Sequence, residues 1–256
     1  MSRKSKLIAY ILLGAMLVLI FTLDISTRNS RRKMTCSGIN IEIVDSAKLG
    51  FINSKEIKRI IDQEYGSYQG ECLDSLKLKE MEEILESKSS ILNCEAFITT
   101  DGMLNIRIEE RDPVIKLITR SGSFFIDETG YLFPAKENYE NGLTEIIGHF
   151  HIDPNWKGVL ASPKQRYWLS NLLLMIQYME EEKEWSEAFK SIEADKKGNI
   201  SLKPQTGKET FLFGPPDNYE VKFSKIRDYY RYIVESKGEG HYTKVSVKND
   251  GQIVCK

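Results

Sequence analysis

The chain has only three histidines in 256 residues, and it lacks the motifs that mark several common catalytic sites. There is no Gly-x-Ser-x-Gly sequence for a nucleophilic serine. Gly207-Lys208 ends like a phosphate-binding loop, but no glycine stands five residues before Gly207. His149 and His151, with Asp153 nearby, do not provide an evident full set of metal ligands. We therefore expect no catalytic, cofactor-binding or metal-ligating residues, and predict that the protein is not an enzyme.

Cysteine is also scarce, and its spacing matches neither a zinc site nor a Cys-x-x-Cys redox motif. The four cysteines are Cys36, Cys72, Cys94 and Cys255. An even number in an exported domain permits disulfides, and Cys72 and Cys94 are the closest pair in sequence. Free thiols that pack as small apolar side chains fit the same residues equally well. Both alternatives stay open from the sequence.

The chain has no large excess of positive charge outside its first 33 residues. It carries 36 basic and 37 acidic residues overall, and the first 33 residues hold seven basic and one acidic. Residues 34–256 therefore hold 29 basic and 36 acidic residues, a net charge of −7. Binding to nucleic acid needs clustered lysine and arginine to neutralise phosphates. We exclude nucleic acid as a partner.

Long hydrophobic runs are absent except for one, the seventeen uncharged residues from Leu7 to Leu23. A helix of this length extends about 25 Å, so it spans a hydrocarbon core of about 30 Å if Asp24 and Ile25 sit at the interface or if the bilayer thins slightly. We predict a transmembrane helix over residues 7–25, preceded by a short tail over residues 1–6. The alternative is a cleaved secretory signal, although the end of the run offers no Ala-x-Ala-like cleavage site.

The segment after the run, residues 26–36, is polar and basic and suits a linker next to lipid headgroups. Four basic residues follow the hydrophobic run and three precede it. The positive-inside rule therefore does not orient the predicted anchor.

A small domain is predicted over residues 37–113, with elements in the order strand, helix, helix, strand, strand. Alternating isoleucines indicate a first strand over residues 39–44. Asn53 or Ser54 can cap a first helix, which carries an apolar stripe of Ile57, Ile60 and Ile61. A second apolar stripe indicates a helix over residues 77–87. Two strands follow over residues 92–99 and 103–109, and the Asp101-Gly102 pair between them is typical of a hairpin turn.

A second domain is predicted over residues 114–256, as a mixed β-sheet with flanking helices. Short strand patterns separated by Gly and Asn turns recur along it. Ser162-Pro163 indicates the start of one helix, and a second is expected over residues 224–235. The domain ends in a predicted hairpin of residues 244–248 and 252–256. The predicted fold class is α+β, with a single N-terminal transmembrane helix ahead of both domains.

Several motifs occur together in an order that resembles one known family. The end of the small domain, with Glu110-Arg111-Asp112-Pro113-Val114, resembles the close of a POTRA domain in FtsQ/DivIB cell-division proteins. The stretch from Phe125 to Phe133, an apolar strand that runs into Asp127-x-x-Gly130 and back, resembles the family's next marker. Phe211-Leu212-Phe213-Gly214 and the final hairpin resemble its β domain. The family-motif residues are Glu110, Arg111, Pro113, Asp127 and Gly130.

The resemblance implies a non-enzymatic, bitopic scaffold of the bacterial division machinery. Its N-terminus is then cytoplasmic, the bulk of the chain is periplasmic, and the protein sits in the inner membrane and gathers at mid-cell. The exported character of both domains orients the anchor where its flanking charges do not. Such a scaffold recruits FtsB-like and FtsL-like single-span partners and so helps control septal peptidoglycan synthesis. The alternative is a membrane-anchored envelope protein whose POTRA-like interaction domain acts in protein assembly or secretion.

The resemblance also implies where the partner binds, because the family's contact is strand addition at the sheet edge formed by the last strand. An edge strand exposes backbone N–H and C=O groups that an incoming strand satisfies. The predicted partner-binding residues lie in the final hairpin and are Lys244, Val245, Val247, Lys248, Asn249, Gln252, Ile253, Val254, Cys255 and Lys256.

Overall fold

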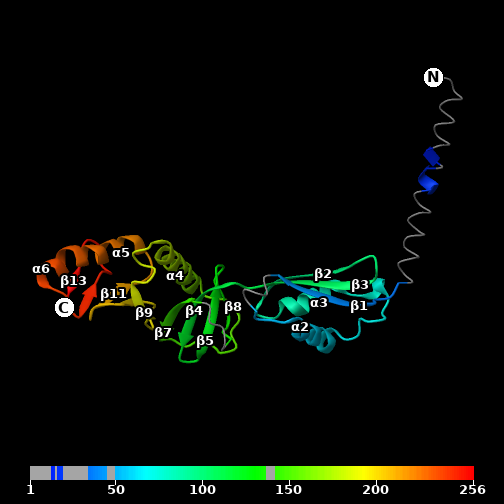
Figure 1. The fold of residues 1–256 in the computed structure, drawn as a ribbon, viewed down its shortest axis with the longest axis horizontal. Coiled ribbons are helices and arrows are strands. Elements are labelled where there is room, and N and C mark those ends of the chain that lie inside the picture. Colours follow the sequence, from blue (N-terminus) through cyan, green and yellow to red (C-terminus); the bar gives the residue numbers. More distant parts are fainter. Residues whose placement is uncertain (1–12, 15, 20–33, 45–49, 137–141) are drawn as a thin grey trace, which may run out of the picture. The chain divides into compact units, whose positions relative to one another are not determined.

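The structure is a computed structural model that describes residues 13–14, 16–19, 34–44, 50–136 and 142–256. The chain divides into two compact units, Met1–Glu110 and Arg111–Lys256, and each is described by itself (Figure 1).

Most of the predicted anchor, residues 7–25, lies outside the described residues. Residues 13–14 and 16–19 are helical, and their side chains are exposed at Leu13, Leu17 and Leu19. Among the residues that the structure describes, no helix has the length and apolar character needed to cross a bilayer. The anchor therefore stays a prediction from the sequence.

The first unit contains a three-stranded sheet in the order β1-β3-β2. Its strands are β1 (Gly38–Val44), β2 (Ile91–Ile98) and β3 (Met103–Glu110). The central strand β3 pairs parallel with β1 and antiparallel with β2. Gly102 turns the chain between β2 and β3 with a φ of 84°, which glycine adopts without a steric cost.

Short helices cover one face of this sheet. They are α2 (Ser54–Ile60), which continues as a π-helical turn η1 (Ile61–Tyr65), then η2 (Leu73–Ser75) and α3 (Leu78–Glu86). The Asn53 side chain accepts a hydrogen bond from the Glu56 backbone N–H at 3.0 Å, so Asn53 is the cap of the two predicted candidates. Fully buried side chains from both layers form the core: Ile57, Ile61, Met81, Leu85, Leu104, Ile106 and Ile108.

The second unit is built on a ten-stranded sheet in the order β13-β12-β11-β10-β9-β7-β4-β5-β6-β8. The first five strands in sequence are β4 (Pro113–Thr119), β5 (Gly122–Asp127), β6 (Tyr131–Pro134), β7 (Thr144–Gly148) and β8 (Gly158–Val159). The others are β9 (Phe189–Ala194), β10 (Ile200–Pro204), β11 (Thr210–Gly214), β12 (Lys244–Ser246) and β13 (Val254–Cys255). The β4/β7, β7/β9 and β11/β12 pairs are parallel and the others are antiparallel.

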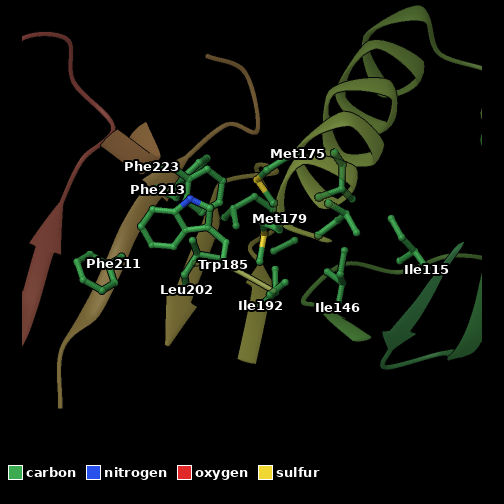
Figure 2. Packing of buried hydrophobic residues seen from close by; sticks show 14 of the residues in the cluster. Ile115, Ile146, Met175, Met179, Trp185, Ile192, Leu202, Phe211, Phe213 and Phe223 are labelled. Atoms are coloured by element: carbon green, nitrogen blue, oxygen red, sulfur yellow. The ribbon is translucent and has the colours of Figure 1, made fainter. Parts of the chain in front are cut away.

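Helices pack on one face of the ten-stranded sheet and bury a continuous apolar core (Figure 2). They are α4 (Pro163–Glu181), α5 (Tyr219–Asp228), a π-helical turn η3 (Tyr229–Val234) and α6 (Glu235–Lys237). Met175 and Met179 of α4 and Phe223 of α5 contribute to the same cluster as Trp185 and Phe211. This mixed α+β arrangement was predicted. Pro163 begins α4 as expected, but the Ser162 side chain makes no capping hydrogen bond.

The final hairpin is shorter than predicted, since β12 ends at Ser246 and β13 spans only Val254–Cys255. After Ser246, the Lys225 ammonium of α5 donates to the Asn249 carbonyl at 2.6 Å and to the Val247 carbonyl at 3.4 Å. The Val247 backbone N–H donates to Leu212 of β11, so β11 and α5 hold this part of the chain.

All four cysteines are free thiols in the structure. Cys94 is buried in the first unit, and burial raises the pKa of its thiol to about 12, with smaller contributions from Glu82 and Glu86. The raised pKa keeps the unreactive, protonated form at neutral pH.

We expect Cys94 to resist alkylation by iodoacetamide in the native protein at about pH 8.5, near the pKa of an unperturbed thiol. The same residue should react readily after unfolding in urea, because its thiolate then forms freely. Mass spectrometry of the peptide that contains Cys94 measures both rates. Equal rates in the native and unfolded chains would contradict the buried environment.

Candidate functional site

The family-motif residue Glu110 is buried at the end of β3, with 3% of its surface exposed. Its Oε1 accepts a hydrogen bond from the Ile52 backbone N–H at 2.7 Å. Ile52 lies just before the Asn53 cap of α2, so the carboxylate ties the start of this helix to the central strand. Glu110 is thus a structural residue of the first unit.

Arg111 and Asp127 form a buried ion pair in the second unit. Arg111 Nη1 donates to Asp127 Oδ2 at 2.8 Å, and the two side chains are 13% and 5% exposed. The Arg111 guanidinium also lies 3.7 Å from the centroid of the Tyr131 ring, within cation–π range. The pair connects the entry to β4 with the turn between β5 and β6. Pro113 occupies the first position of β4, where a strand tolerates proline.

Asp127 also organises the turn between β5 and β6. Its Oδ1 accepts from the Thr129 backbone N–H at 2.9 Å, the Thr129 hydroxyl at 2.6 Å and the Tyr131 backbone N–H at 3.0 Å. Gly130 follows with a φ of 79°, and a Cβ there would lie 3.4 Å from Leu169 of α4. The predicted Asp-x-x-Gly motif therefore shapes a turn that packs against a helix.

The candidate binding edge is β13, which ends the ten-stranded sheet on one side. Lys244 N donates to Lys256 O at 3.0 Å, and Lys256 N donates to Lys244 O at 2.9 Å. In an antiparallel ladder, the next pair along exchanges no hydrogen bonds between its two strands. That pair is Val245 and Cys255. The Cys255 N–H and C=O therefore point away from β12, toward the outer side of the edge.

The predicted partner-binding residues divide by exposure. Val245 and Val247 are fully buried in the core, so their side chains are not available to a partner. Ile253 and Cys255 are half-buried and pack against the same core. The exposed members are Lys244, Lys248, Asn249, Gln252, Val254 and Lys256. A strand added at this edge would meet the backbone of β13 and this exposed set.

Two buried lysines of α5 support this end of the sheet, and sequence reasoning did not single them out. Lys222 is 4% exposed, and its ammonium donates to Pro215 O at 2.6 Å and Asp217 Oδ1 at 2.8 Å. Lys225 is 9% exposed and holds the turn after β12 through the Val247 and Asn249 carbonyls. The lysines thus fix the loops that flank β11 and β12.

Residues 112–256, more than half of the chain, match the family described as FtsQ/DivIB, C-terminal related. The chain belongs to this FtsQ/DivIB-related family. Residues 34–109 match the POTRA-like domain family. The resemblance predicted from the sequence is therefore confirmed. No curated protein matches the chain.

Membership in the FtsQ/DivIB-related family indicates a scaffold role in cell division. FtsQ/DivIB proteins and POTRA domains are generally non-enzymatic. His149, one of the two histidines considered at first as metal ligands, lies beside a carboxylate in this FtsQ/DivIB chain. His149 Nε2 lies 3.3 Å from Glu193 Oε2, and the same carboxylate bonds to Lys203, whose ammonium lowers the pKa of Glu193. Within the described ranges, no group of three or more metal-ligating side chains occurs.

An aromatic cluster lies beside the other end of β11 in the FtsQ/DivIB-related unit. The Tyr230 hydroxyl donates to Glu209 Oε1 at 2.8 Å, and the Tyr230 ring meets Phe211 and Tyr229 edge to face. Burial raises the pKa of the Tyr230 phenol strongly, and the bond to Glu209 adds to the shift. The Tyr230 hydroxyl thus stays a hydrogen-bond donor at physiological pH, and the cluster holds η3 against the sheet.

Proposed function

We propose that this chain is a non-enzymatic scaffold of the bacterial division machinery that binds FtsB-like and FtsL-like single-span partners. In this proposal, residues 7–25 anchor it in the inner membrane with residues 1–6 in the cytoplasm and the two domains in the periplasm. The protein gathers at mid-cell, and through its partners it influences septal peptidoglycan synthesis. Family membership and the scarcity of catalytic motifs support this role.

The geometry of β13 supports partner binding at this edge. It is a terminal strand, and the hydrogen bonds between Lys244 and Lys256 turn the Cys255 backbone groups outward. An extended partner segment would satisfy these groups and continue the sheet by one strand. The exposed lysines at positions 244, 248 and 256 would then favour acidic side chains on the partner.

The predicted residue Lys248 follows β12 and lies against the end of β11. The β11 end residue Gly214 has a φ of 79°, and a Cβ there would lie 2.8 Å from Lys248 Cβ. The absence of a side chain at Gly214 therefore lets the Lys248 backbone approach the end of β11. We propose that the Lys248 ammonium contacts an acidic residue of the partner.

The test is replacement of Cys255 with proline. Proline removes the outward N–H of Cys255 but leaves the inward groups of Val254 and Lys256. We expect co-purification with a tagged FtsB-like partner to be lost, because an added strand loses a backbone donor. Cys255→Ala keeps the N–H and should keep binding.

The matched control lies on the opposite edge of the same sheet. Val159 is exposed in β8, which ends the sheet beyond β6. We expect Val159→Pro to leave co-purification unchanged. Equal retention of the partner by the Cys255→Pro and wild-type chains would rule out strand addition at β13.

A further inference from the structure

The two edges of the first unit's sheet differ sharply. At the β2 edge, the Glu86 carboxylate accepts from the Cys94 backbone N–H at 3.2 Å, and the Glu82 carboxylate accepts from the Ala96 backbone N–H at 2.8 Å. Both carboxylates come from α3, which packs beside the strand. Side chains of the same chain therefore occupy the donors that an added strand would use. These hydrogen bonds protect the β2 edge against pairing with another strand.

The opposite edge, the outer side of β1, follows a regular alternation. Cys36 N donates to Glu71 O and Cys36 O accepts from Gly70 N, so residue 36 points outward, whereas Ser37 N donates inward to Gly102 O. The β1–β3 register runs without a shift. By period-two alternation, the backbone groups of Asn40, Glu42 and Val44 then also point outward.

The outer side of β1 has little protection against strand pairing: Glu42 is its one charged residue, and the bridge between Thr35 and Cys72 covers the edge only ahead of the strand. The strand is seven residues long, and it carries no proline, no lysine and no bulge. Among the described residues, β1 ends the sheet order, and no strand pairs with its outer side. The terminal strands of the second unit, β8 and β13, span two residues each. The outer side of β1 is the longest terminal edge in the described part of the chain that is free of proline, lysine and bulges.

The sequence of β1 is self-complementary. Ile39, Ile41 and Ile43 pair with buried residues of β3 and so share the helix-covered face, whereas Asn40 and Glu42 lie on the other face. The pattern reads the same in both directions about Ile41. An antiparallel second copy centred there would place three isoleucine pairs on one face. It would also set each Glu42 opposite an asparagine, not opposite another carboxylate.

We propose that the outer edge of β1 is a self-association surface at which two copies of this chain pair antiparallel about Ile41. The two three-stranded sheets then form one six-stranded sheet with both β1 strands at its centre. A register centred on Asn40 would leave only two isoleucine pairs, and one centred on Glu42 would bring two carboxylates together. Charge and apolar pairing both select the Ile41 register.

Disulfide trapping in the full chain tests the register. In this arrangement Ile41 and its symmetry mate form a non-hydrogen-bonded pair, with Cα atoms about 4.5 Å apart, a separation that a disulfide spans. We expect Ile41→Cys to form a covalent dimer on mild oxidation, several-fold above the wild-type chain, whose four cysteines set the background. Ile39→Cys should stay at background because residue 39 faces residue 43 of the second copy.

Two further experiments test the register and the backbone pairing of the two β1 strands. A mixture of Ile39→Cys and Ile43→Cys chains should cross-link, whereas each alone should not. Adding Glu42→Pro to Ile41→Cys removes an outward donor and should reduce the dimer to background. Background cross-linking by both Ile41→Cys and the mixture would overturn the proposal. Equal cross-linking by Ile39→Cys alone, or cross-links only to other proteins, would overturn it as well.

Discussion

Replacement of Asp127 with alanine is expected to destabilise the second unit by about 3–5 kcal/mol, the usual cost of breaking a buried ion pair by removing one partner. The change leaves the Arg111 guanidinium, 13% exposed, without its carboxylate. It also removes the acceptor for three donors of Thr129 and Tyr131 in the β5–β6 turn. Both losses occur at one position, so we expect a larger effect than from either loss alone.

Urea denaturation followed by tryptophan fluorescence measures how much the Asp127 substitution lowers the free energy of unfolding of the second unit. All three tryptophans, Trp156, Trp168 and Trp185, lie in the second unit. Asp127→Asn keeps a hydrogen-bond acceptor for the turn but loses the charge. Its free energy of unfolding should therefore lie between those of the wild-type chain and Asp127→Ala. The exposed neighbour Glu128 is the control, and Glu128→Ala should change the free energy of unfolding by less than about 0.5 kcal/mol. Similar midpoints for the two alanine variants would contradict the role given to Asp127.

Replacement of Lys225 with methionine is the second large expected effect. Methionine keeps most of the apolar stem but removes the ammonium that bonds to the Val247 and Asn249 carbonyls. Carbonyls left without a partner cost about 1–3 kcal/mol. We expect the turn after β12 to loosen, and a cost of about 1.4 kcal/mol on the binding conformation would weaken the partner complex about tenfold.

The effect of Lys225→Met should be local to the final hairpin. Amide hydrogen exchange should become faster at Val254, which pairs with Ser246, and stay unchanged in the first unit. Lys237 is an exposed lysine in α6, and Lys237→Met serves as the matched control. If the two variants bind the partner equally well, Lys225 does not hold the binding edge in place.

Local sequence signals predicted the small domain well, because its elements depend on neighbours in the chain. The Asn53 cap and the Gly102 turn are both short-range devices, and the structure contains both. Glu110 was singled out only through the family motif, although it continues the buried alternation of Leu104, Ile106 and Ile108. Period-two alternation along β3 therefore contained the signal for an inward carboxylate.

The contacts of Lys222 and Lys225 that support the binding edge could not be predicted from local sequence signals. The helix expected over residues 224–235 begins at Tyr219 instead, after Asn218 in a left-handed conformation with a φ of 46°. Lys222 therefore fell outside the predicted helix. The partners of Lys225 lie 22 and 24 residues away along the chain, and they meet the lysine only because β12 pairs with β11. Contacts of that range follow from sheet topology, which local periodicity does not encode.

Amide hydrogen exchange at Cys255 tests the claim that β13 binds its partner by strand addition. The Cys255 N–H points outward in the free chain, so it should exchange quickly. We predict strong protection of this amide when the FtsB-like partner is bound, with no change at Val159 on the opposite edge. A bound partner that leaves the Cys255 amide unprotected would contradict the claim.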